Sequence, residues 1–299
     1  MKNIFLFIVV ALSLGCHQAN DSKQITIVTT TGIVGDCIAQ LVDKQAKVES
    51  IMGAGVDPHL YKPSQGDITL LSDADIVIYN GLHLEGKMAA MLHKLSQNKP
   101  VYAIGDYIAP ALLKPADKTS ELKDPHIWFD PTIWLQGLEG VARELDKQNK
   151  LDNIYHNYQV YADDINALFL TLKQDLDSNL STSQRILITS HDAFSYFGDA
   201  FGFKVRGLQG ISTTAEYGTK DVKDITDFII DNHVQSVFVE TSIPHKNLQA
   251  VVASAQARNY ELNIGGTLYS DALGDENTPA NTYKGMISTN VSTIIKGLK

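Results

Sequence analysis

The hydrophobic residues of the chain follow two patterns that alternate along its length. Short runs rich in valine, isoleucine and threonine predict β-strands, and between them apolar residues recur every three or four positions, which predicts helices. The predicted strands are 25–30, 48–52, 74–80, 101–104, 185–190, 203–206, 236–240 and a last one that ends near residue 270. Because strands and helices alternate, we expect parallel βαβ units and therefore an α/β fold with parallel sheets.

The longest periodic stretch lies between the two halves of this pattern. Apolar residues recur at intervals of three or four from Leu151 to Leu180, with no Gly or Pro among them. This predicts one stiff helix, roughly 40 Å long, with Asp152 or Asn153 at its N-cap. A core helix or a coiled-coil seam is the alternative, but the position between two αβ halves favours a rigid helix that joins two lobes. The predicted organisation is an N-terminal lobe at 25–150, the linking helix at 151–182 and a C-terminal lobe at 183–299.

The start of the chain has the pattern of an export signal. Lys2 precedes an apolar run at 4–14, which is too short to cross a bilayer as a helix. We therefore interpret residues 1–15 as a signal peptide and expect the protein to be exported.

Cys16 is expected to carry a lipid. Gly15 and Cys16 resemble a lipobox, in which the cysteine becomes the lipidated N-terminus, although Ser13 stands where this motif usually has leucine. Residues 16–24 would then form a polar tether to the membrane. The alternative is an ordinary cleaved signal that leaves Cys16 free. The second cysteine, Cys37, lies in an apolar helical pattern and is interpreted as a small buried residue rather than a reactive thiol.

Composition and charge narrow the classes of partner. Apolar residues make up 44% of the 299 residues, which supports a packed core. The formal net charge is −9, and an acidic chain repels phosphate backbones, so we expect no nucleic-acid partner. The same charge favours the approach of cations, although acidity alone identifies no ligand.

Four potential metal ligands occur at predicted turns. His59, His191 and Asp271 each come soon after a predicted strand. His126 follows an Asp-Pro turn. Open α/β sheets place their ligand-binding groups at the carboxyl ends of strands. The four residues are separated by 67, 65 and 80 positions, which excludes a short zinc-finger motif and places each in a different loop. We therefore predict that they converge on one metal ion in a cleft between the lobes.

This ligand set favours a binding site over a hydrolytic one. Three imidazoles and a carboxylate fill a four-coordinate shell, so no position has to remain open for water. Each residue also has an ordinary explanation, since a histidine beside Asp-Pro is often bonded to nearby backbone and Asp271 could cap a turn. Glu240, at another strand end, is a competing carboxylate for which a structural salt bridge is favoured. Further histidines are interpreted as surface or helix-cap residues: His83, His93, His156, His233 and His245.

Six sequence blocks resemble the metal-binding receptors of ABC importers, the cluster A-I (cluster 9) solute-binding lipoproteins. The blocks cover essentially the whole mature chain in the order found in that family. They are 55–61 (Gly-Val-Asp-Pro-His-Leu-Tyr), 80–85, 124–131, 189–197, 209–213 and 268–274. The resemblance implies two αβ lobes joined by one long helix. It also implies that a metal lies between the lobes, held by His59, His126, His191 and Asp271.

The resemblance implies a function as well. Members of this family capture a divalent transition metal with high affinity outside the cytoplasm and deliver it to a cognate ABC permease. We therefore expect a monomeric, non-enzymatic receptor in the periplasm or on the outer face of the cytoplasmic membrane, held there by a lipid anchor. Small tilts of the lobes, or movements of loops around Asp271, would control release. Two alternatives are a secreted zinc-dependent hydrolase, with Glu240 as general base, and a surface adhesin.

The third ligand position separates two groups within this family. His191 is usual for zinc receptors, whereas glutamate there is typical of manganese and iron receptors, and three imidazoles suit Zn²⁺ better than Mn²⁺. Against zinc, the loop at 114–125 lacks the histidines that many zinc receptors carry. Residues 216–218 are Glu-Tyr-Gly where the family often has Glu-Pro-Ser, and we expect this loop to affect cleft closure or permease docking. The prediction is Zn²⁺, with Mn²⁺ second.

Overall fold

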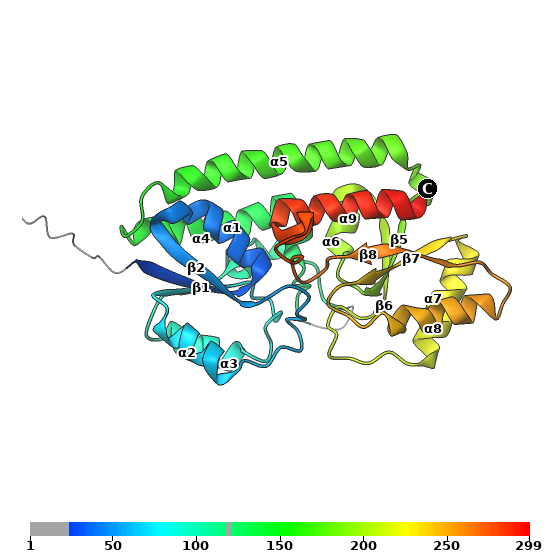
Figure 1. The fold of residues 1–299 in the computed structure, drawn as a ribbon, viewed down its shortest axis with the longest axis horizontal. Helices are drawn as coiled ribbons and strands as arrows, with labels where there is room; N and C mark the ends of the chain where they lie inside the picture. Colours follow the sequence, from blue (N-terminus) through cyan, green and yellow to red (C-terminus); the bar gives the residue numbers. More distant parts are fainter. Residues whose placement is uncertain (1–23, 118–120) are drawn as a thin grey trace, which may run out of the picture.

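Two parallel sheets with helices on both faces form the protein, in a computed structural model that describes residues 24–117 and 121–299 (Figure 1). The predicted signal peptide at 1–15, the lipidation site Cys16 and all but the last residue of the tether at 16–24 lie outside the described residues. None of the helices in the described part combines the length and the hydrophobicity needed to cross a membrane. The predicted α/β fold class is confirmed.

The two sheets repeat one strand order. The first has the order β2-β1-β3-β4 and the second β6-β5-β7-β8, and all neighbouring strands in them are parallel. The strands are β1 (Ile25–Thr31), β2 (Ala46–Met52), β3 (Ile76–Tyr79), β4 (Val101–Ala103), β5 (Ile186–His191), β6 (Lys204–Gln209), β7 (Ser236–Glu240) and β8 (Asn263–Leu268). The predicted last strand therefore ends at Leu268, which leaves Asp271 in the loop after it.

Helices connect successive strands within each lobe, except α4, which leads to the long helix. The first lobe contains α1 (Gly32–Val42), α2 (Gln65–Asp73), α3 (Ala89–Ser96) and α4 (Pro131–Lys147), and the second contains α6 (Ser195–Phe201), α7 (Thr219–Asp231) and α8 (Lys246–Gln256). Their starts follow from local sequence, because Ser64 caps α2 in a capping box with Asp67. The Asp130 side chain accepts backbone N–H groups of the first turn of α4 and so caps the helix, and Pro131 occupies the first helical position.

The long helix predicted between the lobes is α5 (Ile154–Asn179). It begins three residues later and ends three residues earlier than the predicted 151–182. Asn153 occupies its N-cap position with φ 58°, a left-handed conformation that asparagine tolerates, and its side chain makes no capping hydrogen bond. Figure 1 shows α5 running along one side of both lobes. It packs against α1 and α4 of the first lobe and against the C-terminal helix.

A second helix joins the lobes, and the sequence pattern did not predict this. Helix α9 (Tyr283–Leu298) follows β8 of the second sheet, yet it packs against α1 and α5 as well as β8. The backbone N–H of Tyr283 donates to Asp36 Oδ2 at 2.8 Å, and its hydroxyl donates to the Trp128 carbonyl at 2.7 Å. The start of α9 is therefore fixed to the first lobe.

The two lobes share one hydrophobic core. A continuous cluster of buried side chains runs from beneath α1, α4 and α5 to beneath α6 and α9. Smaller clusters lie on the opposite face of each sheet, one beneath α2 and α3 and one beneath α7 and α8. Because close-packed interiors resist deformation, the shared core limits how far the lobes can separate.

Candidate metal centre

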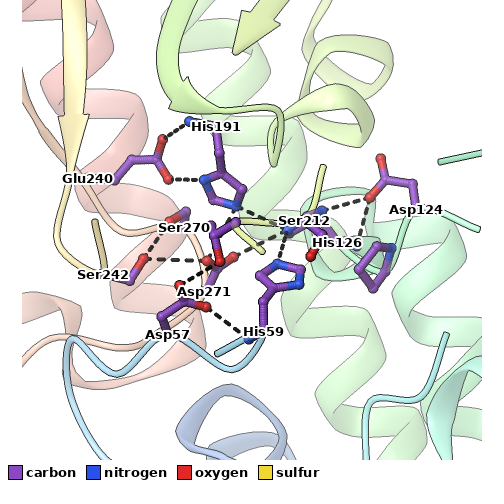
Figure 2. Close-up of polar contacts among 12 residues, drawn as sticks. Asp57, His59, Asp124, His126, His191, Ser212, Glu240, Ser242, Ser270 and Asp271 are labelled. Carbon is purple, nitrogen blue, oxygen red and sulfur yellow. Dashed lines mark hydrogen bonds and ion pairs between the residues drawn. The ribbon is translucent and has the colours of Figure 1, made fainter. Parts of the chain in front are cut away.

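The structure brings the four predicted ligands together. His59 lies in the loop after β2, His191 is the last residue of β5, and Asp271 lies in the loop after β8. His126 lies just before the short 3₁₀ helix Ile127–Phe129, in the segment that leads to α4. All four are at most 4% exposed, and their candidate donor atoms lie within 4.8 Å of one another (Figure 2). Two of them come from each lobe.

The donor atoms surround one point. His126 Nε2 lies 3.3 Å from the Nε2 atoms of both His59 and His191. The Asp271 carboxylate faces the same point, with Oδ1 at 3.3 Å from His126 Nε2 and Oδ2 at 3.3 Å from His191 Nε2. These residues therefore offer three nitrogen donors and two oxygen donors to a common centre.

Two buried carboxylates hold the rings of His126 and His191 from behind. Asp124 Oδ1 lies 2.7 Å from His126 Nδ1 and also accepts the backbone N–H of His126 at 3.0 Å. Glu240 Oε2 lies 2.6 Å from His191 Nδ1, and its Oε1 accepts the backbone N–H of His191 at 2.9 Å. A carboxylate beside Nδ1 favours the tautomer that carries its proton there and leaves Nε2 with a lone pair for a metal, so both contacts favour Nε2 as the donor and restrain the two rings.

A different arrangement supports His59. Asp57 Oδ1 accepts the backbone N–H of His59 at 2.8 Å, as in an Asx turn. The other oxygen of Asp57 accepts the hydroxyl of Thr213, which belongs to the second lobe, at 2.7 Å. On the Asp271 side, the Ser242 hydroxyl lies 3.4 Å from Asp271 Oδ2. Both lobes therefore contribute supporting hydrogen bonds as well as candidate ligands.

Burial and charge shift the pKa values of the site in opposite directions. Burial lowers the pKa of His59 to about 3, although Asp271 opposes this. Burial also acts to lower the pKa of His126, but the carboxylates of Asp124 and Asp271 outweigh it and raise the value to about 9. For Asp271, burial acts to raise the pKa, but His191 and His126 outweigh it and lower the value well below 3.8. The site is thus built to hold an ionised carboxylate next to positive charge.

Sequence reasoning missed the supporting residues, although it contained a signal for two of them. Asp-Pro-His occurs at 57–59 and again at 124–126, and in both places the aspartate accepts the backbone N–H of the histidine two residues later. Glu240 was expected to form a structural salt bridge, and the structure places it on His191. The histidines interpreted as surface or cap residues are exposed: His83, His93, His156, His233 and His245.

A groove leads to the site from outside. Its lining includes Leu82, His83, Pro125 and Ser212, and of the four candidate ligands it includes His59 alone, within the part of the chain that the structure describes. The side of the site that carries His59 is therefore the side nearest to solvent.

Comparison with known proteins identifies the family. The model of a family described as "Zinc-uptake complex component A periplasmic" matches residues 27–297. The chain belongs to this family. It is 39% identical over 300 aligned positions to the manganese-binding lipoprotein MntA of Bacillus subtilis, an alignment that covers 98% of this chain and 97% of MntA. It is 38% identical over 282 positions to the zinc-binding protein TroA of Treponema pallidum, covering 94% of this chain and 90% of TroA.

The fold of a solved relative agrees with these matches. The structure of the periplasmic zinc-binding protein TroA of Treponema pallidum has a TM-score of 0.88 and 37% identity, covering 92% of this chain and 99% of that one. A more distant relative of Streptococcus mutans, SloC, is 25% identical over 311 positions, which cover 100% of this chain and 99% of that protein; it is named as the substrate-binding lipoprotein of a metal ABC transporter. The predicted family resemblance is therefore confirmed, and so is the expectation of a binding protein rather than an enzyme. Because the relatives are named for different metals, family membership does not choose between Zn²⁺ and Mn²⁺.

Proposed function

We propose that this protein captures Zn²⁺ outside the cytoplasmic membrane and delivers it to an ABC permease for import. The observation that carries the proposal is the convergence of His59, His126, His191 and Asp271, from both lobes, on one buried point. A buried set of donors that comes from two lobes is suited to enclosing an ion and releasing it when the lobes shift. The relatives named as metal-binding lipoproteins support the transport role.

The charges of the site favour a divalent cation. Asp124, Glu240 and Asp271 are at most 1% exposed, and beside neutral imidazoles they would place three negative charges in a region of low dielectric constant. Buried charges are costly unless opposite charge compensates them. A divalent cation at the three Nε2 atoms supplies that compensation, and it allows the imidazoles to be neutral and to act as ligands.

The spacing of the donors supports zinc. A tetrahedral Zn²⁺ with bonds of about 2.0–2.1 Å places neighbouring donors roughly 3.3–3.4 Å apart. His126 Nε2 lies 3.3 Å from the Nε2 atoms of His59 and His191 and from Asp271 Oδ1, and His191 Nε2 lies 3.3 Å from the other carboxylate oxygen, Asp271 Oδ2, while the whole donor set lies within 4.8 Å. The second Asp271 oxygen offers a fifth donor, and imidazole-rich sites suit zinc better than manganese.

Manganese is the second candidate, because the relative MntA is named as a manganese-binding lipoprotein. Equilibrium affinity does not separate the two metals, since Zn²⁺ binds most nitrogen and oxygen sites more tightly than Mn²⁺. The coordination number does separate them. A Co²⁺-substituted protein with the strong visible absorption of four- or five-coordinate cobalt supports the zinc geometry, whereas the weak absorption of six-coordinate cobalt supports manganese.

We also propose a cellular arrangement. Residues 1–15 are removed on export, Cys16 is lipidated, and the monomeric receptor stays at the outer face of the membrane. In this arrangement the chain has one lobe at 25–150 and a second at 183–299, joined by the linking helix at 151–182. The relatives named as lipoproteins support the anchor. Mass spectrometry of the membrane fraction tests it, because an unmodified Cys16 contradicts the proposal.

The alternatives have less support. A hydrolase needs a free general base, but both oxygens of Glu240 are used by His191, at 2.6 and 2.9 Å. The surface-adhesin alternative has no observation of its own in the site.

Zinc titration of the metal-free protein tests the proposed function. We expect His59→Ala and His126→Ala to weaken zinc binding strongly, because each removes one donor from the shell. The matched control is His156→Ala, which removes an exposed imidazole from α5 and should bind zinc like the unchanged protein. If both site variants keep the original affinity, the assignment is wrong.

A further inference from the structure

His126 and His59 both belong to the first lobe, but they differ in how firmly their segments are attached to the second lobe. The segment that carries His126 is fixed to the second lobe at several points. The Trp128 indole N–H donates to the Ser270 carbonyl at 3.0 Å, and the Tyr196 hydroxyl donates to the Asp124 carbonyl at 3.2 Å. The rings of Phe129 and Phe194 stack with their centroids 4.6 Å apart. His126 therefore moves with the second lobe and with the shared core.

The loop that carries His59 has far fewer contacts with the second lobe. In this loop, residues 53–64, the Thr213–Asp57 hydrogen bond is the one hydrogen bond to the second lobe among the described residues. A further approach is made at Gly55, where a side chain would meet the Thr241 carbonyl oxygen. Leu60, next to His59, is 49% exposed. This loop is therefore the part of the site that can move away with the least loss of packing.

The same bond is attached directly to the ligand. One oxygen of Asp57 accepts the Thr213 hydroxyl, and the other holds the backbone N–H of His59 (Figure 2 shows this second contact). Thr213 is only 9% exposed, so water competes poorly for its hydroxyl. Any motion that separates Thr213 from Asp57 therefore also frees the turn that positions the His59 ring.

Thr213 is itself presented by a loop that is tied to the second lobe. Asn247 of α8 donates its amide to Gln209 Oε1 at 3.2 Å, and Gln209 donates to the Ala215 carbonyl at 3.1 Å. Tyr217 has its hydroxyl 3.5 Å from Asn247 Oδ1. The Thr213 hydroxyl thus moves with the second lobe, and its hydrogen bond couples that lobe to the loop at 53–64.

We propose that His59 is the ligand that leaves first when the metal exchanges, and that Thr213 and Asp57 are positioning residues whose hydrogen bond sets the rate of metal release. This rests on the proposed function of metal capture. It assigns release to the loop at 53–64 rather than to the loop around Asp271. Asp271 is a poor candidate for movement. The carbonyl of the neighbouring Ser270 accepts a hydrogen bond from Trp128, and the Asp271 carboxylate lies beside the Ser242 hydroxyl. The groove that leads outward passes His59, which is consistent with this order.

The test is the rate at which zinc leaves the loaded protein. Zinc-loaded protein is mixed with a large excess of EDTA in a stopped-flow instrument, and dissociation is followed for the unchanged chain, Thr213→Val and Thr213→Ser. We expect release from Thr213→Val to be roughly 5- to 30-fold faster, the range for loss of one hydrogen bond to a partly buried carboxylate. Thr213→Ser keeps the hydroxyl and should release zinc at close to the original rate.

Controls separate this role from a general loss of stability. Thr214→Val removes the neighbouring hydroxyl, which bonds to Ser212 within the same loop, and should leave the release rate unchanged. Thermal melting of the metal-free variants checks that each folds, and Thr213→Ala replaces Thr213→Val if the latter does not. The association rate should change much less than the dissociation rate, because the bond forms only after the loop closes.

The outcomes distinguish this proposal from the proposed function. If the unchanged chain binds zinc but Thr213→Val releases it at the original rate, the proposed role of the Thr213–Asp57 hydrogen bond is refuted and metal capture stands. Equal acceleration in Thr213→Ser and Thr213→Val also refutes it, because the hydroxyl would then be irrelevant. Fast release confined to the variants without the hydroxyl supports control of release by the Thr213–Asp57 hydrogen bond. If the unchanged chain binds no metal, the proposed function is wrong, and the proposed control of metal release is wrong with it.

Discussion

Replacement of Glu240 by glutamine gives the sharpest test of how the site prepares its ligands. In the protein, one oxygen of Glu240 lies 2.6 Å from His191 Nδ1 and the other accepts the His191 backbone N–H at 2.9 Å. Glutamine has nearly the same shape but only one oxygen. Its amide group must therefore face one of these two donors, and that donor loses its acceptor.

The magnitude follows from this geometry. A hydrogen bond to a charged group contributes about 1.5–3 kcal/mol, which corresponds to roughly 10- to 150-fold in an equilibrium constant. Independently of that value, loss of a partner that orients a metal-ligating histidine typically lowers metal affinity about 10- to 100-fold. We therefore expect Glu240→Gln to weaken zinc binding about 10- to 100-fold, because His191 loses its fixed orientation and its polarising carboxylate.

The assay is competition between the protein and a chelating dye of known zinc affinity. Glu261→Gln, an exposed site before β8, is the matched control and should bind zinc like the unchanged chain. Circular dichroism and thermal melting of the metal-free variants show whether each has folded. A folded Glu240→Gln protein whose affinity changes less than about threefold would mean that the contact does not prepare His191, and the reasoning would be wrong.

Three other predictions follow from stability, reactivity and protonation. Leu172→Ala on the buried face of α5 should lower the free energy of unfolding by about 2–5 kcal/mol, whereas Leu170→Ala, which is 64% exposed, should change it by less than about 0.5 kcal/mol, both measured by urea denaturation. Burial raises the pKa of the Cys37 thiol above its usual value, so in a Cys16→Ser background Cys37 should react with a thiol reagent only in denaturant, and equally fast labelling of the native protein contradicts this. Zinc affinity should fall as the pH drops below about 9, because nearby carboxylates raise the pKa of His126 to about 9 and that of His191 well above 6.5, so protons compete with the metal for both imidazoles; a flat titration between pH 9 and 6 contradicts this.

The residues predicted from the sequence share a reason for being predictable. His59, His191 and Asp271 follow strands, and parallel strands bring their carboxyl ends to one edge of each sheet. The periodicity from Leu151 to Leu180 likewise marks α5, because one apolar face repeats without interruption. These features depend on local pattern and on general rules of α/β folds.

The contacts between segments could not be predicted in the same way. Thr213 and Asp57 are 156 positions apart, and neither lies in a pattern that specifies its partner. The apolar face of α9 predicts that it is buried but not that it is buried against α1 and α5. An apolar pattern shows which side of a helix faces inward, whereas tertiary packing decides what it faces.

The position of α9 has a consequence for the order of folding. Tyr283 is fully buried, its ring centroid lies 6.0 Å from that of Trp134, and its N–H reaches an aspartate 247 positions earlier. The hydrophobic interior of the first lobe is thus completed by α9, which is synthesised long after the strands and helices of that lobe. While the chain is still emerging, that lobe exposes apolar surface that α9 will later cover. Long-range closure of this kind slows folding, so the chain is prone to aggregation until α9 has been synthesised.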